Sequence, residues 1–119
     1  MTYSDIYSQA ITYTGEIATS TAVSDFSDRA DYLIPGVIAR LAAASIALGT
    51  IPVFPEGKIV KSDNFPLDVR LAPAAAALLA SYLVAAESPE LSKRLISVAD
   101  AALVGVAPVD VSPTTEVYR

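Results

Sequence analysis

The stretch Leu71–Ala86, LAPAAAALLASYLVAA, is strongly apolar and carries no charged residue. Alanine has the highest helix propensity of all residues, and Asp68 just upstream is a favourable N-cap. The stretch therefore predicts a helix from near Asp68 to about Ala86, slightly distorted where Pro73 falls just past the first turn. A helix that is apolar on every side belongs in the interior, so we expect other elements to contact it on several sides. It is shorter than the roughly 20 apolar residues of a membrane span, which favours a buried helix and no membrane partner.

A second helix signal follows at once in Ser88-Pro89-Glu90. These residues supply an N-cap, a proline at the first helical position and an acidic first turn. Apolar residues then recur at helical spacing as far as Gly105, where this helix should end. So short a link between the two helices predicts an antiparallel αα-hairpin.

Two further helices are expected nearer the N-terminus. Ser24 is the expected N-cap of a long amphipathic helix that ends at Gly49. Its largely apolar face consists of residues spaced three and four apart, namely Phe26, Ala30, Leu33, Ile34, Val37, Ile38, Leu41, Ser45 and Leu48. Pro35 removes one backbone hydrogen bond in the middle, so the helix should kink there or, alternatively, break into two. A short helix over Ser4–Thr14, capped by Ser4, precedes it.

The segment between the long helix and the apolar helix, about residues 50–67, has a different composition. Phe54-Pro55-Glu56-Gly57 has proline second and glycine fourth, as type I turns prefer. Ile51 and Val53 before this turn, and Ile59 and Val60 after it, predict a short β-hairpin. A lone hairpin is only marginally stable in water, so we expect it to pack on the helices or on a neighbouring subunit.

The last residues, 106–119, contain Pro108 and Pro113 and show no helical period. Fully extended they could reach about 45 Å, and they are expected either to be disordered or to lie on a neighbouring subunit. The predicted fold class is therefore mainly α. It is a small four-helix bundle-like domain over residues 1–105, with a short β-hairpin insertion at about 50–67 and an extended C-terminal tail over 106–119.

The composition restricts the functions that the chain can have. Its 119 residues suffice for one domain, and 53% of them are hydrophobic. Such a domain should expose some apolar surface, which favours a subunit of an assembly over a lone monomer, although exposed alanine would be the simpler explanation. The net charge of −5, with scattered basic residues, argues against a nucleic-acid-binding surface. Without cysteine or histidine there is no Cys/His zinc site, no thiol chemistry and no histidine base.

Acidic side chains are the remaining candidates for chemistry. Asp25, Asp28 and Asp31 cluster at the start of the long predicted helix, where carboxylates ordinarily compensate the helix dipole. The sequence contains no glycine-rich phosphate loop, no EF-hand spacing and no nucleophile motif. We therefore predict no catalytic residue, no metal site and no cofactor.

Two groups of residues carry a resemblance to a known family. Residues 25–38, DFSDRADYLIPGVI, are similar to the long early helix of phage neck proteins. FPLD at 65–68, LAPAAA at 71–76 and ESPEL at 87–91 are similar to the later helical pair of the same proteins. The chain thus resembles the head–tail connector, or adaptor, proteins of tailed bacteriophages.

The resemblance implies a structural virion protein of the neck, at the head–tail interface, assembled in the host cytoplasm. Such subunits form a ring, commonly a dodecamer, beneath the portal protein, and they also contact tail, stopper or terminator proteins. DNA would pass through the lumen without sequence-specific binding. Family members dock on the portal through a C-terminal segment or a loop. The resemblance therefore implies these subunit or portal interface residues: Ile51, Val53, Phe54, Ile59, Val60, Val109, Val111, Val117 and Tyr118.

Two other functions stay open from the residues alone. The chain could be a small helical protein-binding module or regulator, with an exposed groove beside the alanine-rich helix. It could also be an enzyme whose chemistry depends on carboxylates such as Asp28 or Asp31.

Overall fold

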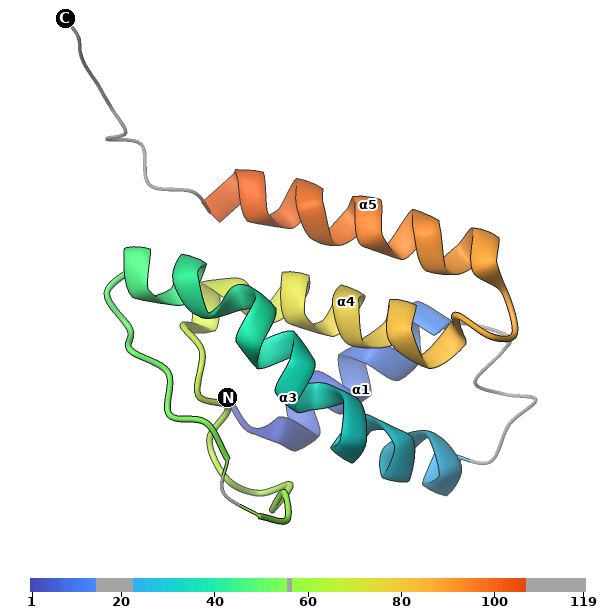
Figure 1. The fold of residues 1–119 in the computed structure, drawn as a ribbon, viewed down its shortest axis with the longest axis horizontal. Helices are drawn as coiled ribbons and strands as arrows, with labels where there is room; N and C mark the ends of the chain where they lie inside the picture. The colour runs from blue at the N-terminus through green and yellow to red at the C-terminus, as the bar shows by residue number, and fades with distance from the viewer. Residues whose placement is uncertain (15–22, 56, 107–119) are drawn as a thin grey trace, which may run out of the picture.

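Helices make up most of the part of the chain that the structure describes (Figure 1). The computed structural model describes residues 1–14, 23–55 and 57–106, and of residues 23–27 the backbone alone. The elements are α1 (Tyr3–Thr14), α3 (Val23–Ala47), the 3-10 turn η1 (Val69–Leu71), α4 (Ala72–Val84) and α5 (Pro89–Val106). The expected mainly α fold is confirmed.

The centre of the molecule is α4, which contacts α1, α3 and α5. Eleven of its thirteen residues are buried, and only Pro73 and Tyr82 reach the surface. Most of these buried residues are alanines, whose small side chains allow three helices to approach one backbone. The prediction of a central helix, contacted on several sides, is confirmed.

The start of α4 differs slightly from the prediction. Asp68 caps η1, not α4, because its carboxylate accepts a hydrogen bond from the backbone N–H of Arg70 at 3.0 Å. One 3-10 turn then leads into α4 at Ala72. Pro73 thus lies in the first turn of α4, where the missing N–H has no intrahelical acceptor to lose.

The expected antiparallel pair is formed by α4 and α5, which lie side by side in Figure 1. Ser88 is the N-cap of α5 as predicted, since its hydroxyl accepts a hydrogen bond from the Leu91 N–H at 3.3 Å. Where the two helices meet, the hydroxyl of Ser92 donates to the carbonyl of Ser81 at 2.9 Å. Because Ser92 is buried, this bond satisfies a polar group inside the helix contact. Gly105 does not end α5, which continues to Val106.

A single continuous helix, α3, contains Pro35. The alternative of two separate helices is therefore wrong. Among the described side chains, its buried face consists of Ala30, Ile34, Val37, Ile38, Leu41 and Ser45. Arg29 ties α3 to the end of α4, because its guanidinium donates to the carbonyl of Leu83 at 2.6 Å. A carbonyl in the last turn of a helix lacks an intrahelical donor, and this arginine supplies one.

The first helix is capped by Thr2 and not by Ser4. Thr2 and Asp5 form a reciprocal capping box, in which the Thr2 N–H donates to the Asp5 carboxylate at 3.0 Å and the Asp5 N–H to the Thr2 hydroxyl at 3.3 Å. The bond from the Thr2 N–H, followed by the interaction of the carboxylate with the Thr2 side chain, lowers the pKa of Asp5. The N–H of Ser4 donates instead to the carbonyl of Lys61, at 3.0 Å.

The predicted β-hairpin is wrong. In the described residues there is no strand, and the one bridge with β geometry joins Thr2 to Asn64. Pro52 and Pro55 have no N–H to donate to a ladder. The second half of the segment is hydrogen-bonded to the N-terminus of the chain. The Ser4 N–H donates to the Lys61 carbonyl, and the Tyr3 N–H donates to the Asp63 carbonyl at 3.1 Å. The segment is therefore a loop, in which Gly57 adopts a φ of +84° that glycine tolerates best.

We expect Ala76→Leu to destabilise the protein. Ala76 is fully buried in α4, and added methylene groups in a packed core cost about 1–3 kcal/mol. Urea unfolding followed by far-UV circular dichroism measures the loss. Ala101→Leu is the matched control, because Ala101 is exposed on α5. Equal stability of the two variants would contradict the close packing of α4.

Candidate functional site

The loop between α3 and η1, residues 50–68, is closed at its base by Asp68; we call it the proline-rich loop. The Asp68 carboxylate accepts from Nε and Nη2 of Arg70 at 2.9 and 3.1 Å, which is a bidentate ion pair. It also accepts from the hydroxyl of Thr50 at 2.8 Å. Because Thr50 begins the loop and Asp68 ends it, these bonds hold the two ends together.

Ser45 completes this arrangement from the last turns of α3. Its hydroxyl donates to the carbonyl of Thr50 at 2.8 Å and accepts from the N–H of Asp68 at 3.0 Å. Ser45, Thr50, Asp68 and Arg70 together are called the Asp68 clamp. The Arg70 side chain and N–H, followed by the Thr50 hydroxyl, hold the pKa of Asp68 well below its usual range. The carboxylate is therefore charged at neutral pH, and its bonds are charge-assisted.

Apolar anchors fix the second half of the loop to the core. Ile59 is only 7% exposed, and Phe65 and Leu67 are buried as well. The ring of Phe65 meets that of Tyr3 edge to face, with centroids 5.6 Å apart, a geometry that aromatic pairs prefer. The sequence predicts Ile59 as an interface residue; the structure corrects this, because its side chain lies in the core of the subunit.

The other apolar residues of the loop face outward. Ile51 is 78% exposed and Val53 is 75% exposed, while Phe54 and Val60 are about half exposed. These four predicted interface residues are therefore available for contact. The other four, Val109, Val111, Val117 and Tyr118, lie outside the described residues.

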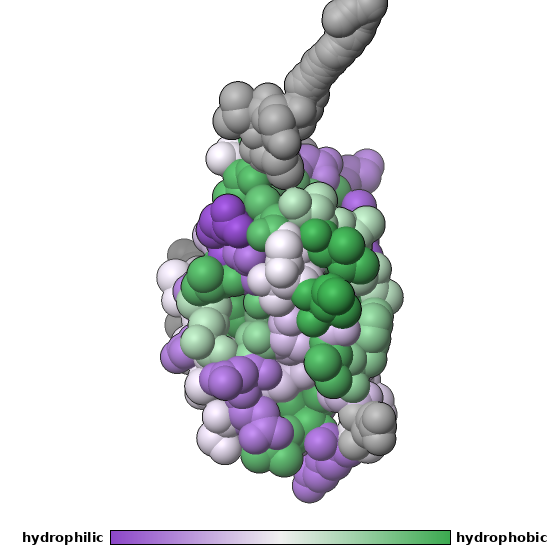
Figure 2. Space-filling model, turned by 90° about the vertical axis from the view of Figure 1, so that its left-hand side faces the viewer, coloured by the Kyte–Doolittle hydropathy of each residue, from purple (hydrophilic) through white to green (hydrophobic). Residues whose placement is uncertain are grey.

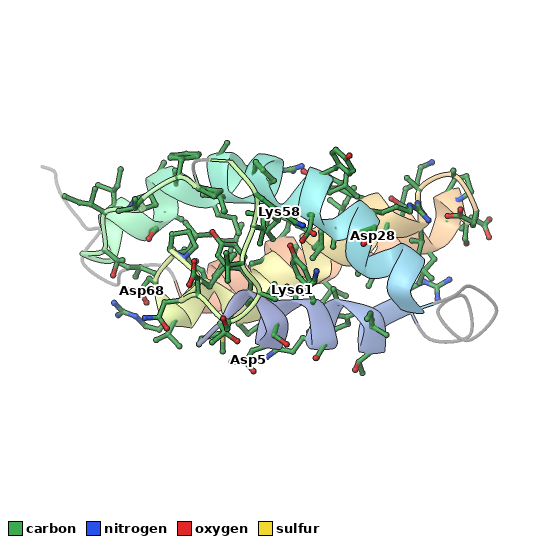
Figure 3. The ribbon with its side chains drawn as sticks, turned by 90° about the horizontal axis from the view of Figure 1, so that it is seen from below. Asp5, Asp28, Lys58, Lys61 and Asp68 are labelled. Atoms are coloured by element: carbon green, nitrogen blue, oxygen red, sulfur yellow. The ribbon has the colours of Figure 1, made fainter. Side chains whose placement is uncertain are left out.

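A groove of about 640 Å³ separates the loop from α3. Its lining combines carboxylates, an aromatic ring, prolines and a lysine, from Asp28, Asp31, Tyr32, Pro35, Pro55, Gly57, Lys58 and Ile59. Figure 3 shows Asp28 on α3 and Lys58 on the loop opposite it. The expected groove beside the alanine-rich helix is thus not this one, because α4 contributes no residue to its wall.

Tyr7, Asp31 and Lys61 form a polar network beside this groove. The buried hydroxyl of Tyr7 donates to one oxygen of Asp31 at 2.7 Å, and Nζ of Lys61 lies 3.4 Å from the other. Burial, and then the bond to Asp31, raises the pKa of Tyr7. Tyr7 therefore remains protonated at neutral pH and acts as a hydrogen-bond donor. The network joins α1, α3 and the loop, which is a structural role.

A second groove, of about 470 Å³, lies on the other side of the loop. Its walls include the exposed residues Val53, Phe54 and Val60 together with Tyr3 and Asp63. The Lys58 side chain borders both grooves. The loop thus contributes residues to the walls of both grooves.

Carboxylates are the candidates for chemistry among the described residues. No group of three or more carboxylates among them could hold a metal ion. Asp28 and Asp31 both line the larger groove, but Asp31 is bound to Tyr7 and Lys61. The site can contact another molecule through its apolar side chains and a few charged groups.

The Asp68 clamp is not predicted from the sequence. Asp68 is predicted to cap the apolar helix, but it caps η1, and the same carboxylate also bonds to Thr50 and Arg70. The proximity of Asp68 to Arg70 was a visible signal. Ser45 lies on the predicted inward face of the long helix, but the local pattern does not show that it bonds to Asp68, 23 positions away.

One further property of α3 bears on the expected absence of a membrane partner. Among the described residues, Asp28–Ala47 is long and apolar enough to cross a membrane by length and composition alone. About a third of its most apolar window is buried inside the subunit. A core helix can pass the same test, and α3 packs on α4 through Ile34, Val37 and Ile38. The absence of a membrane partner stays a prediction.

Comparisons with protein-family models, with curated proteins and with solved structures find no match for this chain.

We expect Asp68→Asn to lower the melting temperature by a few degrees at neutral pH. The folded state lowers the pKa of Asp68, so its stabilisation is present above the ordinary aspartate pKa of about 3.9 and is lost as the pH falls below it. Thermal unfolding from about pH 7 down to pH 2 should show the wild type and the variant converging under acid conditions.

Asp28→Asn is the control for this experiment, because Asp28 is an exposed carboxylate on α3. It should change the melting temperature little at any pH. A gap between Asp68→Asn and the wild type that is the same in acid as at neutral pH would refute the charge-assisted clamp.

Proposed function

We propose that the chain is a head–tail connector subunit of a tailed bacteriophage, a non-catalytic virion protein that forms a ring between portal and tail. The observation that carries this proposal is the proline-rich loop, which is closed at its base and exposes Ile51, Val53 and Phe54. A loop that is already ordered loses less conformational entropy when it docks than a flexible one does. It is therefore well suited to contact between subunits.

The location of the exposed apolar residues supports an assembly role. Apolar residues in a small domain are ordinarily used in its core, and contiguous exposed ones often mark protein contacts. In this chain a buried anchor of the loop, Ile59, is followed directly by the exposed Val60. The loop thus keeps its own anchors and still offers apolar side chains to a portal or to a second copy.

The charge of the chain supports the passage of DNA through the ring. The net charge is −5, and of the described basic residues Lys61 and Arg70 are engaged by Asp31 and Asp68. A surface that repels phosphate would let DNA move without being held. In this proposal the virion neck is the location, and DNA contacts the lumen without sequence preference.

The alternative is a small helical binding module or regulator. The groove between α3 and the loop favours it, because Tyr32 stands at its wall with its ring almost fully exposed. Exposed tyrosines are common contact residues in protein interfaces. A module of this kind would bind one partner as a monomer and would not form rings.

Binding to portal rings tests the proposal. We expect the full chain, mixed with the purified portal protein of the same genome, to form a stacked ring visible by negative-stain electron microscopy. Val53→Asp combined with Phe54→Asp should weaken this binding more than about tenfold, since loss of an interface hot spot costs about 2 kcal/mol or more.

Val98→Asp is the control, because it places an aspartate on a partly exposed apolar residue of α5, away from the loop. It should bind the portal like the wild type. Failure of the wild-type chain to associate with portal rings would refute the connector function. A monomer that binds a single partner and loses it on Tyr32→Ala would favour the alternative.

A further inference from the structure

The groove between α3 and the proline-rich loop has walls of opposite charge. Asp28 and Asp31 line it from α3, and Lys58 lines it from the loop. Figure 3 shows Asp28 on the helix and Lys58 on the loop across from it. The groove volume of about 640 Å³ lies within the range of roughly 300–1,000 Å³ that ligand sites have. Its size therefore permits a bound ligand.

The α3 wall combines carboxylates with an open aromatic ring. Asp28, Asp31, Tyr32 and Pro35 recur three and four residues apart, so they form one stripe along the helix. Tyr32 is 88% exposed, and Asp28, four residues before it, is its neighbour on the helix surface, about 5–6 Å away between Cβ atoms. An arginine guanidinium can stack on a tyrosine ring and donate to a carboxylate at the same time. This wall is therefore suited to an arginine side chain.

Asp28 is the carboxylate that a cationic ligand group would meet. Asp31 already accepts hydrogen bonds from the hydroxyl of Tyr7 and from Nζ of Lys61. Asp28 is exposed and forms no ion pair with the described cations, Lys58 included. Its charge is therefore available to a ligand.

The loop wall calls for the opposite charge. Lys58 is exposed and forms no ion pair with a described carboxylate. Its ammonium group would repel a ligand that carried positive charge alone and would attract an acidic side chain. Lys58 precedes Ile59, whose buried side chain fixes this part of the loop on the core. The wall is therefore in place before a ligand binds, which lowers the entropic cost of binding.

Charged walls make this groove more selective than an apolar surface of the subunit. Figure 2 shows strongly hydrophobic residues exposed at one end of the molecule. Such residues can contact many apolar partners, whereas opposite charges on two walls restrict both the ligand and the direction in which it lies. The groove therefore specifies the chemistry of its occupant.

We propose that this groove binds an extended segment of a partner protein in which an arginine stands next to an acidic residue. In an extended chain neighbouring side chains point to opposite sides. The guanidinium therefore meets Asp28 and Tyr32 on α3 while the acidic side chain meets Lys58 on the loop. The inference goes beyond the connector function and does not rest on it, because Val53 and Phe54 do not line this groove.

Titration of the full chain with short peptides tests the proposal. The probe is the capped tetrapeptide Gly-Arg-Glu-Gly, and the backbone amide signals of the protein are followed by NMR. The signals of Asp28, Tyr32 and Lys58 should shift and reach saturation. Citrulline in place of the arginine, which keeps the shape without the charge, should weaken binding about threefold or more, as should glutamine in place of the glutamate.

Two variants assign each ligand charge to one wall. Asp28→Asn should bind the arginine and citrulline peptides equally and still prefer glutamate to glutamine. Lys58→Met should bind the glutamate and glutamine peptides equally and still prefer arginine to citrulline. Such cycles isolate the interaction between one protein group and one ligand group. Asp100→Asn and Lys93→Met are the matched controls, because they remove the same charges from exposed positions on α5. Both controls should bind all peptides like the wild type.

Three results would overturn the proposal. The first is the absence of saturable shifts in the groove, or equal binding of all the peptides by the wild type. The second is weakening by the α5 controls that matches the groove variants, which would indicate a general effect of charge. The third is movement of the same signals on dilution of the protein alone, which would identify a second copy as the occupant. Ring formation on portals is measured separately, so either proposal can fail alone.

Discussion

The burial of α4 is the constraint on which the rest of the structure depends. Its alanines and leucines are enclosed by α1, α3 and α5, and no other element of the described chain is covered on so many sides. The surrounding helices need contribute only one apolar face each. Their outer faces, and the loop between α3 and η1, are not needed to bury α4 and remain available for contact with other molecules.

The Asp68 clamp fixes the proline-rich loop relative to the buried helix α4. Asp68 precedes η1, which leads directly into α4, so the end of the loop is placed by the core. Thr50 and Ser45 place its beginning relative to the same carboxylate. Polar bonds at the base and the Ile59 anchor let the loop expose Val53 and Phe54 without losing its shape. The proposed docking role rests on this combination.

Much of the helical architecture was predictable because its signals are local. The alanine-rich stretch Leu71–Ala86, the Ser88 restart and the apolar face of α3 each depend on residues within a few turns. The predicted hairpin failed because its signal was also local. A turn between β-branched residues indicates pairing, but it cannot reveal that N–H groups of α1 compete for the loop carbonyls.

The sequence predicted the exposed residues of the candidate site, but not the residues that hold the loop in place. Ile51, Val53, Phe54 and Val60 are exposed as an interface requires, whereas Ile59 turned out to be buried. Whether the side chains at positions 59 and 60 are buried or exposed depends on how the loop packs on α1 and α3. The spacing of residues in the sequence does not predict this packing. The same is true of Ser45, whose partners Thr50 and Asp68 come together only in the folded chain.

Native-state hydrogen exchange across a urea series tests the central position of α4 most directly. If α4 is the element on which the fold depends, the amides of Leu78 and Leu79 should exchange only through global unfolding, with the full free energy and its full urea dependence. Amides of Val53 and Phe54 should exchange through smaller openings. Exchange of the α4 amides by local fluctuation, with a free energy below that of α1 or α5, would contradict this account.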